Sequence, residues 1–318
     1  MSPTTKHAAE QPPEAVIDIR GLSKSYGKFR ALNALDLTVT RGEVMAFLGP
    51  NGAGKSTTIR ILLGLLKADF GEVTLLGQDP WRDVVALHRR LAYVPGDVSL
   101  WPSLTGGQAI DLLGNLRGGV DQGRVTELLE KFELDPTKRG HQYSKGNRQK
   151  VAIVAALAAD VELLILDEPT SGLDPLMEAV FQAEIRAQKD KGTTILLSSH
   201  IMSEAEALAD RVAIIRDGTI VEAGTIEQLR AHTSITIKAT LERPPANLAE
   251  LDFLHSPSAR GATITGHVDR TGLTEAMGTL ALYGLTNLTV SEPSLEDLFL
   301  SQYGELNSGD TNPGNAHA

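Results

Sequence analysis

Cysteine is absent from this 318-residue sequence, and so are long apolar runs. Without cysteine the chain has no disulfide, no thiolate metal site and no thiol catalysis. The longest apolar runs, residues 61–66 and 151–159, are far shorter than the roughly 20 residues that cross a bilayer as a helix. The opening residues, MSPTTKHAAEQPPE, lack the apolar core of a secretory signal. We therefore expect a chain that does not cross a membrane by itself.

Basic residues are also in short supply. Lysine and arginine number 30 against 40 aspartates and glutamates, which gives a formal net charge of −10. The overall charge of such a chain does not attract nucleic acid or anionic lipid, so we expect no nucleic-acid partner and only local phosphate sites. Hydrophobic residues are plentiful at 42%, enough for a large core in one domain or two.

Strand and helix patterns alternate from residue 15 to 231, which predicts an α/β domain with a mostly parallel sheet. Its buried strand candidates are EVMAFLG, LLILDE and TTILLSS. An Asp217-Gly218 pair between two β-prone runs predicts a hairpin turn. The stretch from about 98 to 160 has mainly helical patterns, which predicts a helical subdomain inserted in the sheet domain.

A different pattern begins after residue 231. Residues 232–303 contain strand patterns at SITIKATL, ATITGHV and LTNLTVS and a helix pattern at LTEAMGTLALYG, which together predict a small C-terminal α+β domain. The following SLEDLFLSQY predicts another helix, with Ser294 and Asp297 as its capping box. Residues 1–14 and 304–318 are poor in aliphatic side chains, and we expect both to be disordered tails.

The segment FLGPNGAGKSTTIRILL matches the phosphate-binding P-loop pattern G-x-x-x-x-G-K-[ST]. An apolar strand pattern precedes it and an amphipathic helix pattern follows, so a chance glycine-rich turn is the less favoured explanation. In such a loop backbone N–H groups turn toward phosphate oxygens, Lys55 supplies a charge to the outer phosphates, and Ser56 can coordinate Mg²⁺. The predicted nucleotide-binding residues are Gly49, Pro50, Asn51, Gly52, Ala53, Gly54, Lys55, Ser56 and Thr57.

Two carboxylates follow another predicted strand. The run VELLILDEP places Asp167 and Glu168 at the carboxyl end of a strand, where ligand sites of α/β sheets form. Alone, such a pair is usually part of a solvated loop. Beside a P-loop, Asp167 is predicted to hold Mg²⁺, and Glu168 to orient or deprotonate the attacking water.

In this order the motifs resemble the ATP-binding subunits of ABC transporters over residues 16–230. GPNGAGKS matches the family's Walker A motif, LLILDE its Walker B motif, and SGLD, ending at Asp174, its D-loop. The resemblance implies a P-loop ATPase that uses ATP and Mg²⁺, with Asp174 at the nucleotide interface. It also implies that His200 contacts the γ-phosphate as the switch histidine and that Tyr26 stacks on adenine. Outside this context His200 would be an ordinary surface or capping histidine and Tyr26 a strand-edge residue. The predicted catalytic residues are Glu168, His200 and Lys55.

Residues 143–150, YSKGNRQK, begin a predicted helix with Ser144 as its N-cap. Lys145, Arg148 and Lys150 crowd this end, where the helix dipole favours anions over cations. An unusually basic helix start is the structural explanation. The functional explanation is that an anion binds there.

The family carries its LSGGQ signature at this place, and the signature binds the γ-phosphate of ATP held by the other subunit. The resemblance therefore implies that Ser144, Gly146 and Asn147 line a nucleotide held by a facing chain. Because a chain with one P-loop and one signature cannot complete a site alone, we expect a second ATPase subunit, either a homodimer or a similar domain.

The sequence departs from the family at two positions. Lys145 replaces the signature's first glycine, which either strengthens anion binding or obstructs closure. Gly96, in LAYVPGDVSLW, occupies the place of the Q-loop glutamine that contacts Mg²⁺ and water in the family. Asp97 is the candidate substitute.

The motif EPSLEDLFL resembles the C-terminal tail of bacterial drug- and antibiotic-export ATPases of the daunorubicin-resistance type, whose membrane subunits are separate chains. The resemblance implies an exporter ATPase at the cytoplasmic face of the cell membrane, in contact with the membrane only through a transmembrane permease subunit. Leu100, Trp101 and Leu104 are expected either to receive a helix of that partner or to pack in the core. A soluble ABC-type ATPase and a nucleotide-gated regulatory module without useful hydrolysis remain as alternatives.

Overall fold

The structure is a computed structural model that describes residues 14–231, 234–245, 247–248, 251–292 and 295–296. It divides into two units, one up to Gly224 and one from Thr225 onward, and we describe each by itself. The change of strand and helix pattern in the sequence suggested a boundary at residue 231. The contacts change earlier, where strand β9 (Thr219–Thr225) ends and helix α8 (Ile226–Ala231) begins.

Some sequence predictions fall on residues that the structure does not describe. The two predicted tails, residues 1–14 and 304–318, lie outside the described residues except for Glu14. The predicted helix at 294–303 and its capping box of Ser294 and Asp297 also lie outside them, apart from residues 295–296.

A six-stranded sheet with the order β5-β6-β7-β3-β8-β9 forms the centre of the first unit. Its parallel strands are β5 (Leu91–Val94), β6 (Leu163–Asp167), β7 (Thr194–Ser199), β3 (Val44–Leu48) and β8 (Arg211–Arg216). All residues of β3, β6 and β7 are buried, as expected of parallel strands covered on both faces. The predicted parallel sheet is confirmed.

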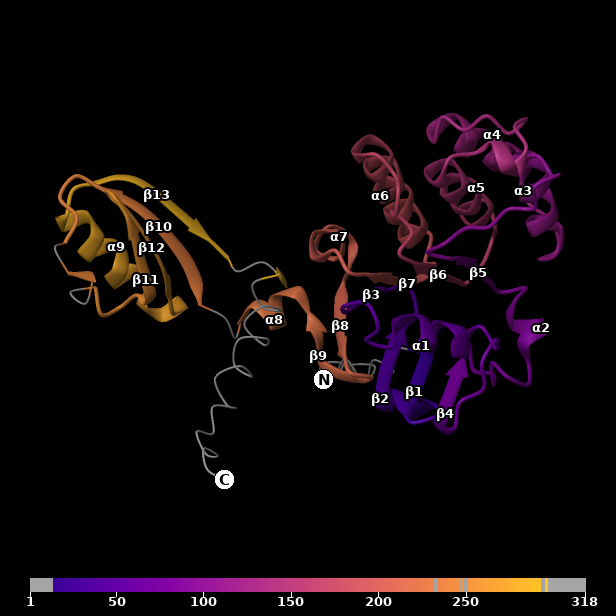
Figure 1. Cartoon of the computed structure of the whole chain (residues 1–318), viewed down its shortest axis with the longest axis horizontal. Helices are drawn as coiled ribbons and strands as arrows, with labels where there is room; N and C mark the ends of the chain where they lie inside the picture. Colours follow the sequence, from indigo (N-terminus) through magenta and orange to yellow (C-terminus); the bar gives the residue numbers. More distant parts are fainter. Residues whose placement is uncertain (1–13, 232–233, 246, 249–250, 293–294, 297–318) are drawn as a thin grey trace, which may run out of the picture. The chain divides into compact units, whose positions relative to one another are not determined.

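The two faces of this sheet belong to different cores. On β6, Leu164 and Leu166 pack with the helices α5 and α6, whereas Leu163 and Ile165 pack with α1 and a second sheet. This alternation follows from the two-residue period of a strand. Figure 1 shows α5 and α6 on one side of the sheet and α1 on the other.

The second sheet is antiparallel, with the order β2-β1-β4, and the sequence analysis missed it. Its strands are β1 (Ala15–Tyr26), β2 (Phe29–Thr40) and β4 (Phe70–Leu75). Register shifts interrupt the pairing of β1 with β2, so their alternation of apolar and polar residues is irregular in the sequence. At the hairpin that joins them, Tyr26 pairs with Phe29.

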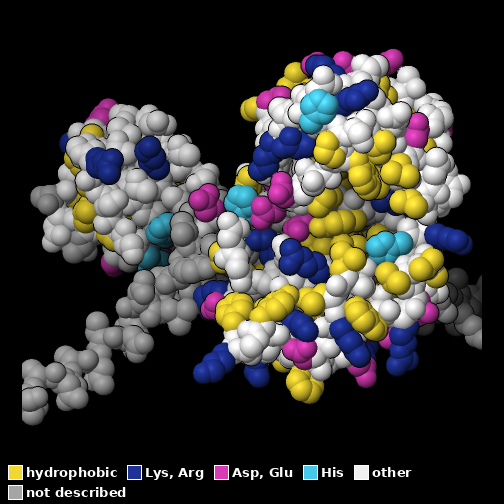
Figure 2. Space-filling model, turned by 45° about the vertical axis from the view of Figure 1, so that its right-hand side comes forward, with side chains coloured by type: hydrophobic (Ala, Val, Ile, Leu, Met, Phe, Trp, Pro, Cys, Tyr) yellow, Lys and Arg dark blue, Asp and Glu magenta, His cyan; other side chains and the backbone are white. Residues whose placement is uncertain are grey.

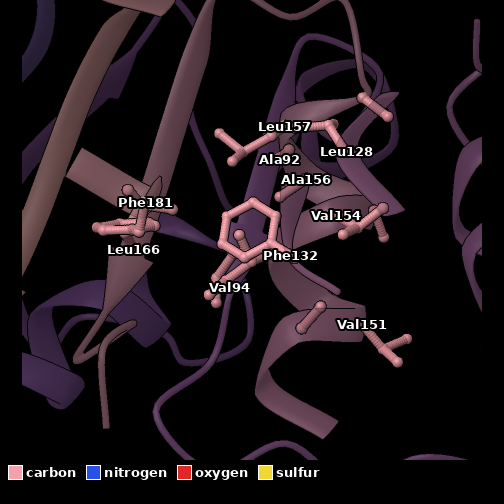
Figure 3. Packing of buried hydrophobic residues seen from close by; sticks show 14 of the residues in the cluster. Ala92, Val94, Leu128, Phe132, Val151, Val154, Ala156, Leu157, Leu166 and Phe181 are labelled. Carbon is pink, nitrogen blue, oxygen red and sulfur yellow. The ribbon is translucent and has the colours of Figure 1, made fainter. Parts of the chain in front are cut away.

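Eight helical segments complete the described part of the first unit. They are α1 (Lys55–Leu62), α2 (Val84–Leu87), α3 (Gly106–Asn115), α4 (Gln122–Lys131), the 3₁₀ turn η1 (Gly140–Gln142), α5 (Lys145–Leu157), α6 (Pro175–Asp190) and α7 (Met202–Leu208). Helices α3, α4 and α5 fall within the stretch predicted to be helical, residues 98–160. Figure 3 shows the ring of Phe132, which follows α4, near Val94 of β5 and Ala156 of α5, so these helices share a core with the sheet.

In its described residues the second unit contains, after α8, a four-stranded antiparallel sheet with the order β11-β12-β10-β13 and the longer helix α9. Its elements are β10 (Ile235–Leu241), β11 (His255–Arg260), β12 (Thr263–Val268), η3 (Arg270–Gly272), α9 (Leu273–Leu282) and β13 (Leu285–Ser291). Three strands and α9 confirm the predicted patterns, while β11, with the polar sequence HSPSAR, was missed. Among the described residues no helix is both long and apolar enough to span a membrane.

Candidate active site

The P-loop connects β3 to α1 at the carboxyl edge of the parallel sheet. Gly52 and Gly54 have φ angles of 85° and 117°, which lie in the left-handed region that favours glycine. A side chain at Gly54 would also stand 2.9 Å from the carbonyl oxygen of Ala31. Helix α1 begins directly afterwards at Lys55, so the unpaired N–H groups of its first turn face the loop.

Lys55 is buried beneath this loop. Its Nζ lies 2.6 Å from the carbonyl oxygen of Gly49 and 3.6 Å from Oε1 of Glu168. Burial lowers the pKa of Lys55, while the nearby carboxylates of Glu168 and Asp167 act against that shift. A lysine held among carbonyl and carboxylate oxygens can exchange these contacts for phosphate oxygens.

The two predicted carboxylates end strand β6. Asp167 accepts a hydrogen bond from Oγ of Ser198 on β7 at 2.5 Å. Glu168 has a φ of 47°, an unfavourable conformation for a residue with a side chain, and its N–H donates to the carbonyl oxygen of Ser198 at 3.0 Å. The carboxylate of Glu168 lies 3.4 Å from Nδ1 of His200. The structure thus brings the three predicted catalytic residues together.

A pocket of about 220 Å³ opens over the P-loop. It is lined by Tyr26, Phe29, Ala31, Pro50, Asn51, Gly52, Gly54, Lys55, Ser56, Thr57 and Glu168. Gly49 and Ala53 are buried within the loop itself. Ser56 is exposed at the pocket and its hydroxyl makes no hydrogen bond to any described residue.

Phe29 lines this pocket and was missed by the sequence analysis. Tyr26 and Phe29 are 46% and 62% exposed, and they are paired across the hairpin of β1 and β2. The short spacing Tyr-Gly-Lys-Phe was the available signal, because a tight turn brings its two aromatic ends together. The pocket therefore offers two aromatic side chains beside the loop.

The signature segment lies apart from this pocket. Ser144 caps helix α5 and accepts a hydrogen bond from the N–H of Asn147 at 3.2 Å. Neither of them, nor Gly146, lines the pocket over the P-loop. Asp174 is exposed and caps α6 by accepting from the N–H of Met177 at 3.0 Å.

The basic helix start has a largely structural explanation. Arg148 donates to the carbonyl oxygen of Tyr143 at 2.8 Å, and the buried Lys150 donates to that of Phe132 at 3.0 Å. Two of the three cations at this helix start therefore already have partners within the chain. Lys145 alone of the three is exposed, and it donates to the hydroxyl of Ser171 at 3.0 Å.

Gly96 borders the Walker B carboxylates. A Cβ atom at Gly96 would lie 3.1 Å from the carbonyl oxygen of Asp167 and 3.6 Å from Cβ of Glu168. Asp97 is exposed and makes no hydrogen bond to a described residue. In the same loop Leu100 packs against the core, whereas Trp101 is exposed.

A larger cavity, of about 640 Å³, lies at the opposite edge of the sheet, where the parallel strands begin. Arginines line it, but Arg41 and Arg90 both bond the carboxylate of Glu162, at 3.1 and 2.5 Å. The charges of Arg41 and Arg90 are thus matched within the chain, as is that of Arg124, which pairs with Glu127 and Glu184. Most of the predicted nucleotide-binding residues of the P-loop line the smaller pocket instead.

Comparison with known proteins identifies the family. The family model described as ABC transporter matches residues 32–171. The chain is 39% identical over 225 residues to the daunorubicin resistance ATP-binding protein DrrA3 of Streptomyces coeruleorubidus, an alignment that covers 69% of this chain and 71% of that protein. The chain belongs to the ATP-binding proteins of ABC transporters.

Two further similarities support this family assignment. The chain is 34% identical over 309 residues to the daunorubicin/doxorubicin resistance ATP-binding protein DrrA of Streptomyces peucetius, and the alignment covers 92% of this chain and 93% of that protein. Its fold matches the dimeric post-hydrolysis state of the ATP-binding cassette MJ0796 bound to ADP and Pi, with a TM-score of 0.61, 25% identity, and coverage of 66% of this chain and 98% of that chain.

These comparisons confirm the predicted family, fold class and activity. The protein is an ATP-binding subunit of an ABC transporter that hydrolyses ATP in connection with transport, and it is similar to daunorubicin-resistance ATP-binding proteins. ABC cassettes dimerise. Of the readings left open by the sequence, the soluble ATPase and the regulatory module without useful hydrolysis are not favoured by these relatives.

Proposed function

We propose that two copies of this chain close around two Mg·ATP, dock on a separate transmembrane permease at the cytoplasmic face of the membrane, and power the export of drug-like compounds. Similarity to daunorubicin-resistance proteins supports the substrate class, and in one case it extends over 92% of the chain. Trp81 and Trp101 on the first unit are each 49% exposed. Figure 2 shows hydrophobic side chains on the surface of this unit, and they supply apolar area for docking a permease.

The proposal of a dimer rests on the separation of the signature segment from the P-loop pocket within one chain. The pocket lined by the P-loop does not include Ser144, Gly146 or Asn147, so one chain presents two half-sites. A second copy that faces the first would bring its signature segment over the bound nucleotide. Each chain would then complete the pocket of the other, so that closure depends on ATP and hydrolysis releases it.

Residues around the P-loop pocket would bind the nucleotide and its Mg²⁺. The N–H groups of the P-loop and the ammonium of Lys55 would bind the phosphates, and Tyr26 with Phe29 would stack on adenine. Mg²⁺ prefers a few protein oxygens together with phosphate oxygens and water, so the free hydroxyl of Ser56 and the carboxylate of Asp167 fit it. The ion would neutralise charge on the phosphates.

The chemistry of hydrolysis falls to two neighbouring side chains. Glu168 would orient or deprotonate the attacking water, and its position beside Nδ1 of His200 supports a pair acting together. His200 would donate to the γ-phosphate as charge develops there. Both belong to loops at the carboxyl edge of the sheet, where the phosphates are expected.

The variant Glu168→Gln tests this function. It should bind ATP and form a dimer that persists, because only the hydrolytic step is removed. Light scattering with and without Mg·ATP, and phosphate release, are the measurements. A second variant, Glu168→Gln with Lys55→Ala, should stay monomeric because nucleotide binding is lost. If Glu168→Gln stays monomeric with Mg·ATP, both alone and with its permease, the proposed sandwich is wrong.

A further inference from the structure

The two catalytic side chains come from different loops. Glu168 follows β6 and His200 follows β7, and Oε1 of Glu168 lies 3.4 Å from Nδ1 of His200. Oγ of Ser198 donates a hydrogen bond to Asp167 and accepts one from the N–H of Glu168, and these bonds join the strands just before the loops diverge. Beyond that point the loops need another connection if the pair is to keep its geometry.

Glu204, in the first turn of α7, makes that connection. One of its carboxylate oxygens accepts a hydrogen bond from Oγ1 of Thr170, which follows Glu168 in the β6 loop. The other accepts from Oγ of Ser199 at 2.6 Å, on the chain immediately before His200. The hydroxyl of Ser199 in turn accepts from the N–H of Ile201 at 2.9 Å. The bridge therefore holds the backbone on both sides of His200.

The carboxylate of Glu204 is buried, and its hydrogen-bond partners are hydroxyl groups and not cations. Glu204 is 7% exposed, and within the part of the chain that the structure describes it has no lysine or arginine partner. A buried carboxylate without a cation is costly unless hydrogen bonds satisfy it, and here two hydroxyls do so. An apolar side chain would fill the same space without that cost, but it would not connect the two loops.

We infer that Glu204 is a positioning residue for hydrolysis. It does not line the nucleotide pocket and acts through the two loops, setting the distance between Glu168 and His200. The β6 loop continues into the D-loop, where Ser171 contacts Lys145 of the signature segment. Movement of the D-loop when a second copy docks would thus reach His200 through Thr170, Glu204 and Ser199. This inference rests on the proposed pairing of Glu168 with His200.

The kinetics of Glu204→Ala and Glu204→Gln test it. Alanine removes the bridge and should lower kcat about 10- to 100-fold, because small displacements of catalytic groups have effects of that size. The KM for ATP should change less than about twofold, because the P-loop is untouched. Glutamine keeps an acceptor and gains a donor that either hydroxyl can accept, so it should restore most of kcat. The double variant Thr170→Val with Ser199→Ala should lower kcat like alanine at Glu204.

A double-mutant cycle separates positioning from general stability. If Glu204 acts through His200, the variant His200→Ala with Glu204→Ala should be no slower than His200→Ala alone. Glu184→Ala is the matched control, because Glu184 is another buried carboxylate, bonded to Arg124 and Lys131 of α4 and away from the pocket. It should lower the melting temperature and leave kcat per folded molecule unchanged.

Three results would overturn the inference: a kcat for Glu204→Ala within twofold of wild type, a glutamine variant as slow as alanine, or independent multiplication of the Glu204 and His200 effects. If Glu204→Ala does not fold, the glutamine variant and the double hydroxyl variant decide the matter. Failure of Glu168→Gln to dimerise on Mg·ATP would refute the proposed function instead, so the two failures are distinguishable.

Discussion

The ammonium of Lys145 donates a hydrogen bond to the hydroxyl of Ser171 at 3.0 Å, so the signature segment and the D-loop touch within one chain. Beside them the backbones of Gly146 and Gly172 are in close contact, and a Cβ atom at Gly146 would overlap the carbonyl oxygen of Gly172. A neutral hydroxyl is an exchangeable partner for an exposed ammonium. The phosphate oxygens of a nucleotide held by a facing chain would compete with this hydroxyl for the ammonium of Lys145.

Lys145→Gln should therefore weaken dimer formation. In a Glu168→Gln background we expect the ATP concentration for half-maximal dimer to rise about tenfold, since a hydrogen bond to a charged group contributes about 1.5–3 kcal/mol. Ser171→Ala frees the ammonium and should leave that concentration unchanged or lower it. Light scattering across an ATP titration is the measurement. Equal, parallel losses in both variants would mean that Lys145 only supports the D-loop.

The aromatic pair beside the P-loop gives a second prediction. Tyr26→Ala and Phe29→Ala should each weaken ATP binding about tenfold, because stacking of a base on an aromatic ring contributes about 1–3 kcal/mol. Phe70→Ala is the matched control, since Phe70 on β4 is 75% exposed and does not line the pocket. A fluorescent ATP analogue reports the dissociation constant. Unchanged binding in Phe29→Ala would remove Phe29 from the adenine site.

Sequence patterns predicted best what local chemistry determines. The turn at Asp217 and Gly218 has φ angles of 48° and 77°, the left-handed pair that an Asp-Gly hairpin requires. The P-loop likewise depends on glycines within one short segment. Such features depend only on residues that are neighbours in the sequence, so they can be predicted from a short segment.

Features that depend on distant segments were missed or misread. The bridge through Glu204 joins Thr170 to Ser199, which come from different strands, and no spacing in the sequence indicates it. The charge of Lys150 suggested an anion, because its partner, the carbonyl oxygen of Phe132, comes from a different part of the chain. Tertiary contacts determine whether a charged side chain is structural or functional.

The Q-loop position gives a third prediction. The backbone of Gly96 is not in the left-handed region, and the nearest atom that an added Cβ would meet is the carbonyl oxygen of Asp167, at 3.1 Å. Gly96→Gln and Gly96→Ala share this contact and should lose similar stability, about 1 kcal/mol. Only glutamine adds an amide near the expected Mg²⁺ and water, and it should hydrolyse ATP roughly tenfold faster than alanine does. Equal rates would show that this loop does not need the amide.

The opposite edge of the sheet gives a prediction on acid stability. Hydrogen bonding to Arg90 is the main cause that lowers the pKa of Glu162 below its ordinary value of 4.5. A carboxyl group with a lowered pKa in the folded state stabilises the fold above its unfolded pKa, and this contribution is lost as the pH falls through the folded value. Glu162→Gln should therefore be less stable than wild type at pH 7 and should lose less stability on acidification.

The expected difference at pH 7 is about 0.5 kcal/mol, because the Glu162 side chain is 38% exposed and solvent screens the pair. Melting temperatures of both proteins between pH 7 and pH 3 are the measurement, and the two curves should converge at the acid end. Parallel curves for Glu162→Gln and wild type would show that the bonds of Glu162 to Arg41 and Arg90 do not stabilise the strand entries in solution.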